Sequence, residues 1–258
     1  MSHIEGPYLN PKYKGMQNEK FLRSPNFNEV DRIFQEAGTL IKMVTIAPEL
    51  PGAIELISYL KERNVIVSIA NSDATYEQAK DAFACGASHI THCFNAMSPI
   101  HHRNPGIVVA AMEEEKVSIQ AIVDNVHLHP AIVRLLHKIK GPDKLVLVTD
   151  ALQAMGAGDG DYIFGGHNVT VEKGIARLKD GTLASSTITM NRALEFTVKD
   201  GISLKDAITM ASETPANVIG LTSKGKLKEG YDADCVLIDN QYNVIWTMSE
   251  GKLIWGSV

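Results

Sequence analysis

The stretch "VIVSIANSDATYEQAKDAFACGASHITHCFNAM", residues 65–97, contains two apolar strands separated by one helix. The helix is predicted over residues 75–86, because Thr75 and Gln78 have the spacing of a capping box and Gly86 suits a helix end. A strand, a helix and a second strand in this order are typical of a parallel βα unit, whose strands are buried on both faces. This stretch therefore predicts an α/β fold.

The same alternation continues on both sides of this stretch. Strands are predicted in residues 41–49, 65–73, 88–97, 117–129 and 144–151, and "HIEGP" (residues 3–7) fits the tail of one more. Two further helices are expected at 51–64, with Ala53, Leu56, Ile57 and Leu60 on one face, and at 130–139, with Ile132, Leu135, Leu136 and Ile139 on one face. A closed (β/α)8 TIM barrel needs eight strands, so we expect a barrel that lacks its first strands.

The pattern changes after residue 151. Residues 156–185 are rich in turns and β-branched residues, which predicts a β insertion. Two helices are expected near residues 189–199 and 203–213, the second capped by Ser203. We expect residues 1–222 to form a partial barrel domain and residues 223–258 to form the C-terminal part of a small β-sandwich domain.

The composition is that of a globular enzyme. The chain has 258 residues, of which 45% are hydrophobic, and a net charge of −5 with both signs interspersed. This argues against a nucleic-acid partner or an anionic membrane surface, and no apolar run reaches the ~18 residues of a spanning helix. Cys85, Cys93 and Cys235 show no CxxC spacing, so we expect a reducing compartment and a cytoplasmic protein.

Side chains that can do chemistry follow the predicted strands where these end. They are Glu5, Asn71, Asp73, His92, Asn95, Asp124, His127 and Asp150. Because the carboxyl ends of parallel strands converge on one face, we expect these residues to meet in one pocket. Carboxylate and imidazole suit a divalent metal such as zinc, and a carboxylate on the last strand suits a general base. Taken singly, a histidine at a strand end is more often structural, and Asp150 could simply cap a loop.

Six longer motifs occur in a fixed order. They are HIEGPYLNP (3–11), THCFNAMSPIHHRNPG (91–106), VDNVHLHP (123–130), LVTDA (147–151), GTLASSTITMNRAL (181–194) and GYDADCVLID (230–239). Together they resemble the N-acetylglucosamine-6-phosphate deacetylases of the amidohydrolase superfamily. The resemblance implies a TIM barrel of the metal-dependent hydrolase type. It also implies hydrolysis of N-acetylglucosamine 6-phosphate to glucosamine 6-phosphate and acetate.

The resemblance also implies roles for the residues that match. Glu5 is similar to the carboxylate metal ligand of the third barrel strand, and His92 to the imidazole ligand of the sixth. The implied metal is zinc, with iron or another divalent metal as alternatives. His127 would contact the substrate amide and stabilise the tetrahedral intermediate. Asp150 would take a proton from the attacking water and pass it to the leaving amine.

Three more residues resemble the site that holds the sugar phosphate. Asn95 and the backbone of Ala96 match the phosphate-binding turn. Arg103 matches an arginine that in this family often reaches across a dimer interface, and its planar guanidinium suits bidentate contact with phosphate. The expected partners are therefore a sugar-phosphate substrate and a second copy of the chain.

Asn71 and Ser185 depart from the family pattern. Asn71 stands where the family has a metal-binding histidine, and an amide oxygen is a weaker ligand for zinc than an imidazole nitrogen. We keep Asn71 as the candidate third ligand and expect lowered metal affinity. Ser185 stands where the family has a glycine.

The chain also begins at what would be the end of the third barrel strand, which fits either a shortened gene product or a degenerate relative. The alternative function is therefore a weakened or inactive relative that only binds amino-sugar phosphate. An amidohydrolase with another N-acyl substrate is a third possibility, against which the phosphate-binding turn argues. An incomplete sheet would leave an open edge, so we expect association through that edge or marginal stability.

Overall fold

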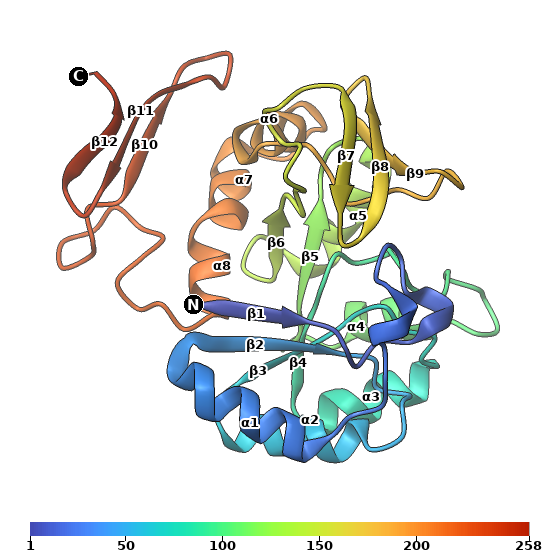
Figure 1. Ribbon diagram of the computed structural model, residues 1–258. Coiled ribbons are helices and arrows are strands. Elements are labelled where there is room, and N and C mark those ends of the chain that lie inside the picture. The colour runs from blue at the N-terminus through green and yellow to red at the C-terminus, as the bar shows by residue number, and fades with distance from the viewer. Residues whose placement is uncertain (258) are drawn as a thin grey trace.

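Six parallel strands form a curled sheet in which each strand pairs with the next along the chain (Figure 1). The structure, a computed structural model, describes residues 1–257. The strands are β1 (Ser2–Glu5), β2 (Ile41–Ile46), β3 (Ile66–Ile69), β4 (Ala87–Ile90), β5 (Ser118–Ile122) and β6 (Leu145–Val148). All five strands expected from the alternation are present, and the "HIEGP" motif supplies the sixth.

Helices follow the strands and cover one face of the sheet. They are α1 (Phe27–Ala37), α2 (Ala53–Glu62), α3 (Tyr76–Cys85), α4 (Gly106–Glu113) and α5 (Pro130–Lys140), and α6 (Met190–Lys199), α7 (Leu204–Ala211) and α8 (Glu213–Val218) follow later in the chain. The capping box of α3 is present as predicted, with Gly86 at its C-cap. Helices α1, α4 and α8 were not predicted.

The two faces of the sheet differ in chemistry. Val44, Ile46, Val67 and Ile69 lie on the face that packs against the helices. Because successive side chains on a strand alternate, Thr45 and the residues equivalent to it point to the other face. There Thr45 and Ser68 both hydrogen-bond with Thr91, and His89 hydrogen-bonds with Ser118. The expectation of strands that are apolar on both faces is therefore corrected: a buried polar layer lies on the second face.

The buried face of α2 is the predicted one, but that of α5 is only partly the predicted one. Helix α2 buries Ala53, Leu56, Ile57 and Leu60. Helix α5 buries Val133, Leu136 and Lys140, whereas Leu135 and Ile139 are exposed. The physical reason lies at Lys140, whose ammonium donates to the backbone oxygens of Ala111 and Glu114 at the end of α4. These contacts turn the side of α5 that carries Lys140 inward, and burial lowers the pKa of Lys140 to about 8.

Two antiparallel sheets accompany the parallel one. The first, β7 (Gly160–Phe164), β8 (His167–Glu172) and β9 (Ile175–Leu178), lies within the predicted insertion. The second, β10 (Cys235–Ile238), β11 (Val244–Ser249) and β12 (Lys252–Gly256), lies at the other side of the molecule (Figure 1). The division into domains at residues 222 and 223 stays a prediction.

The fold is thus mixed α/β, as expected, with a curled six-stranded sheet in place of a full barrel. Within residues 1–257, β1 and β6 are the two end strands and do not pair with each other. None of the helices in this part of the chain combines the length and the hydrophobicity needed to cross a membrane.

Candidate active site

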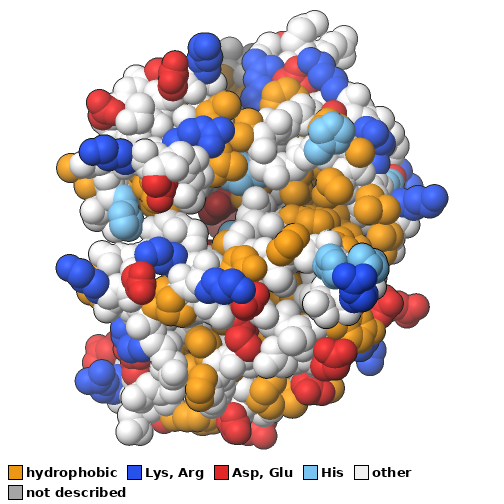
Figure 2. Space-filling view, turned by 90° about the vertical axis from the view of Figure 1, so that its right-hand side faces the viewer, with side chains coloured by type: hydrophobic (Ala, Val, Ile, Leu, Met, Phe, Trp, Pro, Cys, Tyr) orange, Lys and Arg blue, Asp and Glu red, His pale blue; other side chains and the backbone are white. Residues whose placement is uncertain are grey.

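A cavity of about 900 Å³ opens where the strands of the parallel sheet end. Figure 2 shows a hollow on this side of the molecule, with an acidic side chain visible in its depth. Seven of the residues predicted from the sequence line the cavity: Glu5, Asn71, His92, Asn95, Ala96, His127 and Asp150. Residues distant in sequence therefore meet in one place, as expected for the carboxyl ends of parallel strands. Asp73, Asp124 and Arg103 do not line the cavity, so for Asp73 and Asp124 the expectation of a common pocket is wrong.

Three of these residues leave their strands in a left-handed backbone conformation. Asn71, His92 and Asp150 follow β3, β4 and β6, with φ of 47°, 34° and 48°. A side chain in this region costs free energy unless the surrounding structure holds it there. The turn in the backbone directs each side chain into the cavity.

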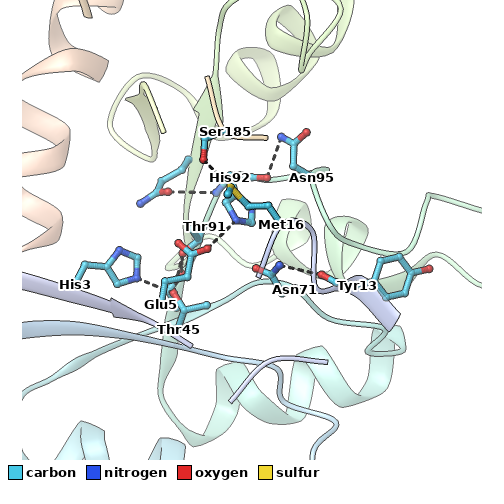
Figure 3. A network of polar contacts seen from close by, with 12 residues as sticks. His3, Glu5, Tyr13, Met16, Thr45, Asn71, Thr91, His92, Asn95 and Ser185 are labelled. Carbon is cyan, nitrogen blue, oxygen red and sulfur yellow. Dashed lines mark hydrogen bonds and ion pairs between the residues drawn. The ribbon is translucent and has the colours of Figure 1, made fainter. Parts of the chain in front are cut away.

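Glu5 and His92 form the charged centre of the site (Figure 3). The distance from Glu5 Oε1 to His92 Nε2 is 3.4 Å, and the His92 side chain is buried. Burial by itself would lower the pKa of His92, but the hydrogen bond and the charge of Glu5 outweigh it and raise that pKa. Burial would likewise raise the pKa of Glu5, and His92 and His3 together bring it below the ordinary value.

Asn71 presents an oxygen to the cavity. Its Nδ2 donates to the backbone oxygen of Tyr13 at 2.9 Å, which fixes the orientation of the amide (Figure 3). Its Oδ1 is buried and has no hydrogen-bond partner within the described residues. A buried acceptor left without a donor or cation costs about 1–3 kcal/mol, so this oxygen favours a ligand in the cavity.

Asp124 orients His127. The carboxylate accepts from His127 Nδ1 at 2.7 Å and also from the backbone N–H groups of His127 and Val126. Burial would raise the pKa of Asp124, but these hydrogen bonds outweigh it and lower that pKa. With Nδ1 occupied, Nε2 is the ring nitrogen left for the cavity. Asp124 was predicted at a strand end without a role; its spacing of three residues from His127 was the available signal.

Asp150 lies in the same cavity under a mixed electrostatic influence. Burial raises its pKa above the ordinary value, and the positive charge of His92 only partly opposes this. The residue is also joined to the segment that directly follows the insertion, because its backbone oxygen accepts from Ser186 N at 2.8 Å. A largely buried carboxylate with a raised pKa, beside an imidazole, can accept a proton from a nucleophile.

The predicted phosphate-binding residues are divided between two places. Asn95 Nδ2 donates to the backbone oxygens of His92 and Cys93, so the turn that includes Ala96 is fixed beside the cavity. Arg103 instead lies exposed on the loop before α4, with its Nη1 2.8 Å from His102 Nε2.

A second wall of the cavity was not predicted. It comes from the loop between β1 and α1, through residues 12–18 with Phe21 and Leu22, and faces Phe164 and Leu183 of the insertion. Ser185 Oγ lies 3.4 Å from Met16 Sδ and joins the two sides. Ser185 has a φ of 56°, which explains why a glycine would suit this position. No periodic pattern in the loop sequence signals such a wall.

Within residues 1–257, no group of three or more His, Cys, Asp or Glu side chains is arranged to hold a metal ion. Glu5 and His92 supply two ligand atoms of that class. The third candidate ligand atom is the side-chain oxygen of Asn71, an amide that lines the same cavity. A carboxylate, an imidazole and an amide oxygen together suit a divalent cation.

The sequence profile of the amidohydrolase family matches residues 3–254. The chain belongs to the amidohydrolase family. Members of this family are metal-dependent. The amidohydrolase chain is 40% identical over 256 residues to the N-acetylglucosamine-6-phosphate deacetylase of Bacillus subtilis (strain 168), covering 97% of the chain and 64% of that protein. It therefore spans less than two thirds of this relative.

Two further relatives match over a similar share of this chain. Over 254 residues the chain is 35% identical to the N-acetylgalactosamine-6-phosphate deacetylase of Escherichia coli O157:H7, covering 98% of the chain and 67% of that protein. A mutant N-acetyl-D-glucosamine-6-phosphate deacetylase from Mycobacterium smegmatis, solved in complex with N-acetyl-D-glucosamine-6-phosphate, superposes with a TM-score of 0.93 and 36% identity, covering 97% of the chain and 67% of that structure. The family resemblance inferred from the motifs is confirmed.

Proposed function

We propose that this chain hydrolyses the N-acetyl group of N-acetylglucosamine 6-phosphate, giving glucosamine 6-phosphate and acetate. The observation that carries the proposal is the meeting of Glu5, His92, His127 and Asp150 in one cavity. The names of the relatives support the same reaction. They also speak against the alternative of a relative that only binds amino-sugar phosphate.

Glu5, His92 and Asn71 are the residues proposed to hold the metal, with zinc as the first choice and iron or another divalent metal as alternatives. The fit is supported by the facing Glu5 and His92 side chains and by the unsatisfied Asn71 Oδ1. When present, the metal would supply a Lewis acid for the amide carbonyl and the attacking water. Because one ligand is an amide, the proposal includes a lowered affinity for zinc.

Asp150 and His127 are proposed to move and stabilise charge in the reaction. Asp150 would take the proton of the attacking water and deliver it to the leaving amine. Its position among His92 and Glu5 in the cavity supports this role. His127, which Asp124 holds through Nδ1, would stabilise the oxyanion of the tetrahedral intermediate through Nε2.

Asn95 and the backbone of Ala96 are proposed to hold the phosphate from one side. Arg103 lies outside the cavity of its own chain, so we propose that it acts across a homodimer interface. We further propose that the curled sheet is part of a (β/α)8 barrel of the metal-dependent hydrolase type. The parallel, sequential strand order and the unpaired outer sides of β1 and β6 in the described residues support this. The free Cys85, Cys93 and Cys235 support a cytoplasmic location.

Steady-state acetate release tests the substrate. The parallel substrates are N-acetylglucosamine 6-phosphate, unphosphorylated N-acetylglucosamine and N-acetylgalactosamine 6-phosphate. We expect kcat/KM for the first to exceed that for the second by at least about 100-fold, because charge-assisted contacts to phosphate are lost. Equal rates with and without the phosphate would refute the proposal. The galactose epimer is the second candidate because of the Escherichia coli relative, and a higher kcat/KM for it would favour that assignment.

A further inference from the structure

Glu49 accepts three hydrogen bonds close to the site without lining the cavity. The residue follows β2, and its side chain is half-buried. Its Oε1 accepts from Asn10 Nδ2 at 2.8 Å and from the backbone N–H of Asp73 at 2.7 Å, and its Oε2 accepts from Ser72 Oγ at 2.7 Å. One carboxylate therefore joins the end of β2, the end of β3 and the loop after β1.

These contacts hold Asn71 from two sides. On one side, Ser72 and Asp73 are the two residues that follow it in the chain, and Ser72 is fully buried. On the other side, Asn10 N donates to the backbone oxygen of Asn71 at 2.9 Å. Asn10 also begins the short 3-10 helix Pro11–Tyr13, whose last residue accepts the Asn71 Nδ2 hydrogen bond.

The hydrogen bond to Tyr13 is what directs Asn71 Oδ1 into the cavity. An amide can turn by half a rotation and exchange its oxygen for a nitrogen at little cost when nothing holds it. Here the backbone oxygen of Tyr13 can only accept, so Nδ2 faces it and Oδ1 lies on the other side of the amide, toward Glu5 and His92 (Figure 3). The position of Tyr13 depends in turn on Asn10, and that of Asn10 on Glu49. Glu49 thus controls an orientation on which the site depends.

We infer that Glu49 is a positioning residue that fixes the left-handed turn at Asn71 and the direction of its side-chain oxygen. This inference rests on the proposed function for its effect on activity, but not for its effect on structure. Partners that orient a metal ligand typically contribute 10- to 100-fold in metal affinity or activity. Removing the Glu49 carboxylate is therefore expected to lower metal affinity or activity by a factor in that range.

Glu49→Gln is the test variant, because it keeps the shape but can no longer accept at both ends of the side chain. Asp239→Asn is the matched control. Asp239 also accepts three hydrogen bonds, from Gln241 N, Asn243 N and Asn243 Nδ2, but in the turn between β10 and β11 and outside the cavity. Zinc affinity is measured by competition with a chromophoric chelator, alongside kcat and KM for N-acetylglucosamine 6-phosphate.

For Glu49→Gln we expect zinc affinity and kcat to fall by at least about tenfold, with KM changed by less than about threefold because Asn95 and Ala96 are untouched. Asp239→Asn should leave all three unchanged. Asn10→Ala should produce part of the same loss and should not add to Glu49→Gln, because both act through one chain of contacts. A loss of zinc affinity that is equal in Asp239→Asn, or full additivity with Asn10→Ala, would overturn the inference.

Hydrogen exchange separates this inference from the proposed function. If the parent chain neither binds zinc nor releases acetate, the proposed function fails, and exchange at the Asn10 and Asp73 amides decides about Glu49. We expect both amides to exchange at least about tenfold faster in Glu49→Gln and unchanged in Asp239→Asn. Unchanged exchange in Glu49→Gln would contradict the inference. If Glu49→Gln does not fold, Ser72→Ala, which removes one of the three hydrogen bonds, is judged by the same criteria.

Discussion

At the scale of single residues, the site is built from backbone positions that are costly to occupy. Asn71, His92 and Asp150 all have positive φ, and none of them is a glycine. Asparagine tolerates this conformation better than most residues because its short polar side chain can hydrogen-bond locally. Asn71 therefore suits its turn as a backbone element, and as the proposed metal ligand it would be weaker than a histidine.

Asn71→His is expected to raise zinc affinity. An imidazole nitrogen replaces an amide oxygen beside Glu5 and His92, and we expect affinity to increase by about tenfold or more. Chelator competition measures the change. Asn64→His is the matched control, because Asn64 is also an asparagine with positive φ but lies exposed outside the cavity. Equal zinc affinity in the parent and in Asn71→His would count against Asn71 as a ligand position.

His89 gives the polar layer beneath the site a defined pH dependence. It is fully buried, and burial lowers its pKa to about 3, while in the unfolded chain a histidine titrates near 6.5. Between these values the unfolded chain binds a proton that the folded chain does not. Proton binding by the unfolded chain therefore lowers the free energy of unfolding as the pH falls below about 6.5, by up to about 1.4 kcal/mol per pH unit. Above about pH 6.5 this loss is absent.

Denaturant unfolding at pH 7.5 and pH 5 measures this effect. Between pH 7.5 and pH 5, the free energy of unfolding of His89→Gln is expected to fall by about 1–2 kcal/mol less than that of the parent chain, because glutamine does not titrate. His102→Gln, at an exposed position, should behave like the parent chain. If His89→Gln and the parent chain show the same difference between the two pH values, His89 is not the group responsible.

The sequence alone predicts which residues line the cavity better than what holds them there. Glu5, His92, His127 and Asp150 could be predicted because they end strands, and parallel strand ends converge. Arg103 was predicted from its motif but lies outside the cavity. Glu49 and Tyr13 could not be predicted, because their contacts join segments whose approach depends on the folded chain and on no local pattern.

At the scale of helices and strands, the sequence likewise predicts where a helix forms better than which of its faces is buried. Helix α2 has a single apolar stripe, and that stripe is buried as predicted. In α7 the spacing predicts Leu204, Ala207, Ile208 and Ala211 on one face. Ala207 is buried as predicted, but Leu204 and Ile208 are exposed, and Met210 from outside this set is buried. Periodicity identifies a helix, while the neighbouring elements decide which side of it is covered.

The capping box of α3 allows a direct test at this scale. Thr75 accepts from Gln78 N, and Gln78 Oε1 accepts from Thr75 N, so Thr75→Ala is expected to destabilise the chain by about 1 kcal/mol. Thr189 occupies the N-cap of α6 without a side-chain capping hydrogen bond. Thr189→Ala should therefore cost clearly less in the free energy of unfolding. Equal losses in the two variants would show that the capping box contributes nothing measurable.

At the scale of the whole molecule, the sheets leave surfaces that a folded protein usually covers. Within residues 1–257, β1 and β6 each pair on one side only. The sheet of β10, β11 and β12 also exposes large apolar side chains: Val236, Leu237, Ile245, Leu253, Ile254 and Trp255. Unpaired strands and exposed apolar faces favour association with other chains.

Light scattering coupled to size exclusion tests whether the chain associates. We expect a mass above that of the monomer or a mass that rises with concentration, together with a broad or low thermal transition. Ser2→Lys places a charge at the exposed end of β1, and we expect it to shift the population toward monomer. A monomer at all concentrations with a sharp thermal transition would contradict this expectation.

Catalysis at Asp150 is the central claim about the whole molecule, and acetate release from N-acetylglucosamine 6-phosphate with and without added zinc tests it most directly. We expect the parent chain to release acetate only with zinc, and Asp150→Asn to be slower by about 100-fold or more, because an amide cannot accept the proton of the attacking water. Circular dichroism confirms that both chains are folded. No acetate release from the folded parent chain with zinc, or an equal rate in Asp150→Asn, would contradict the account.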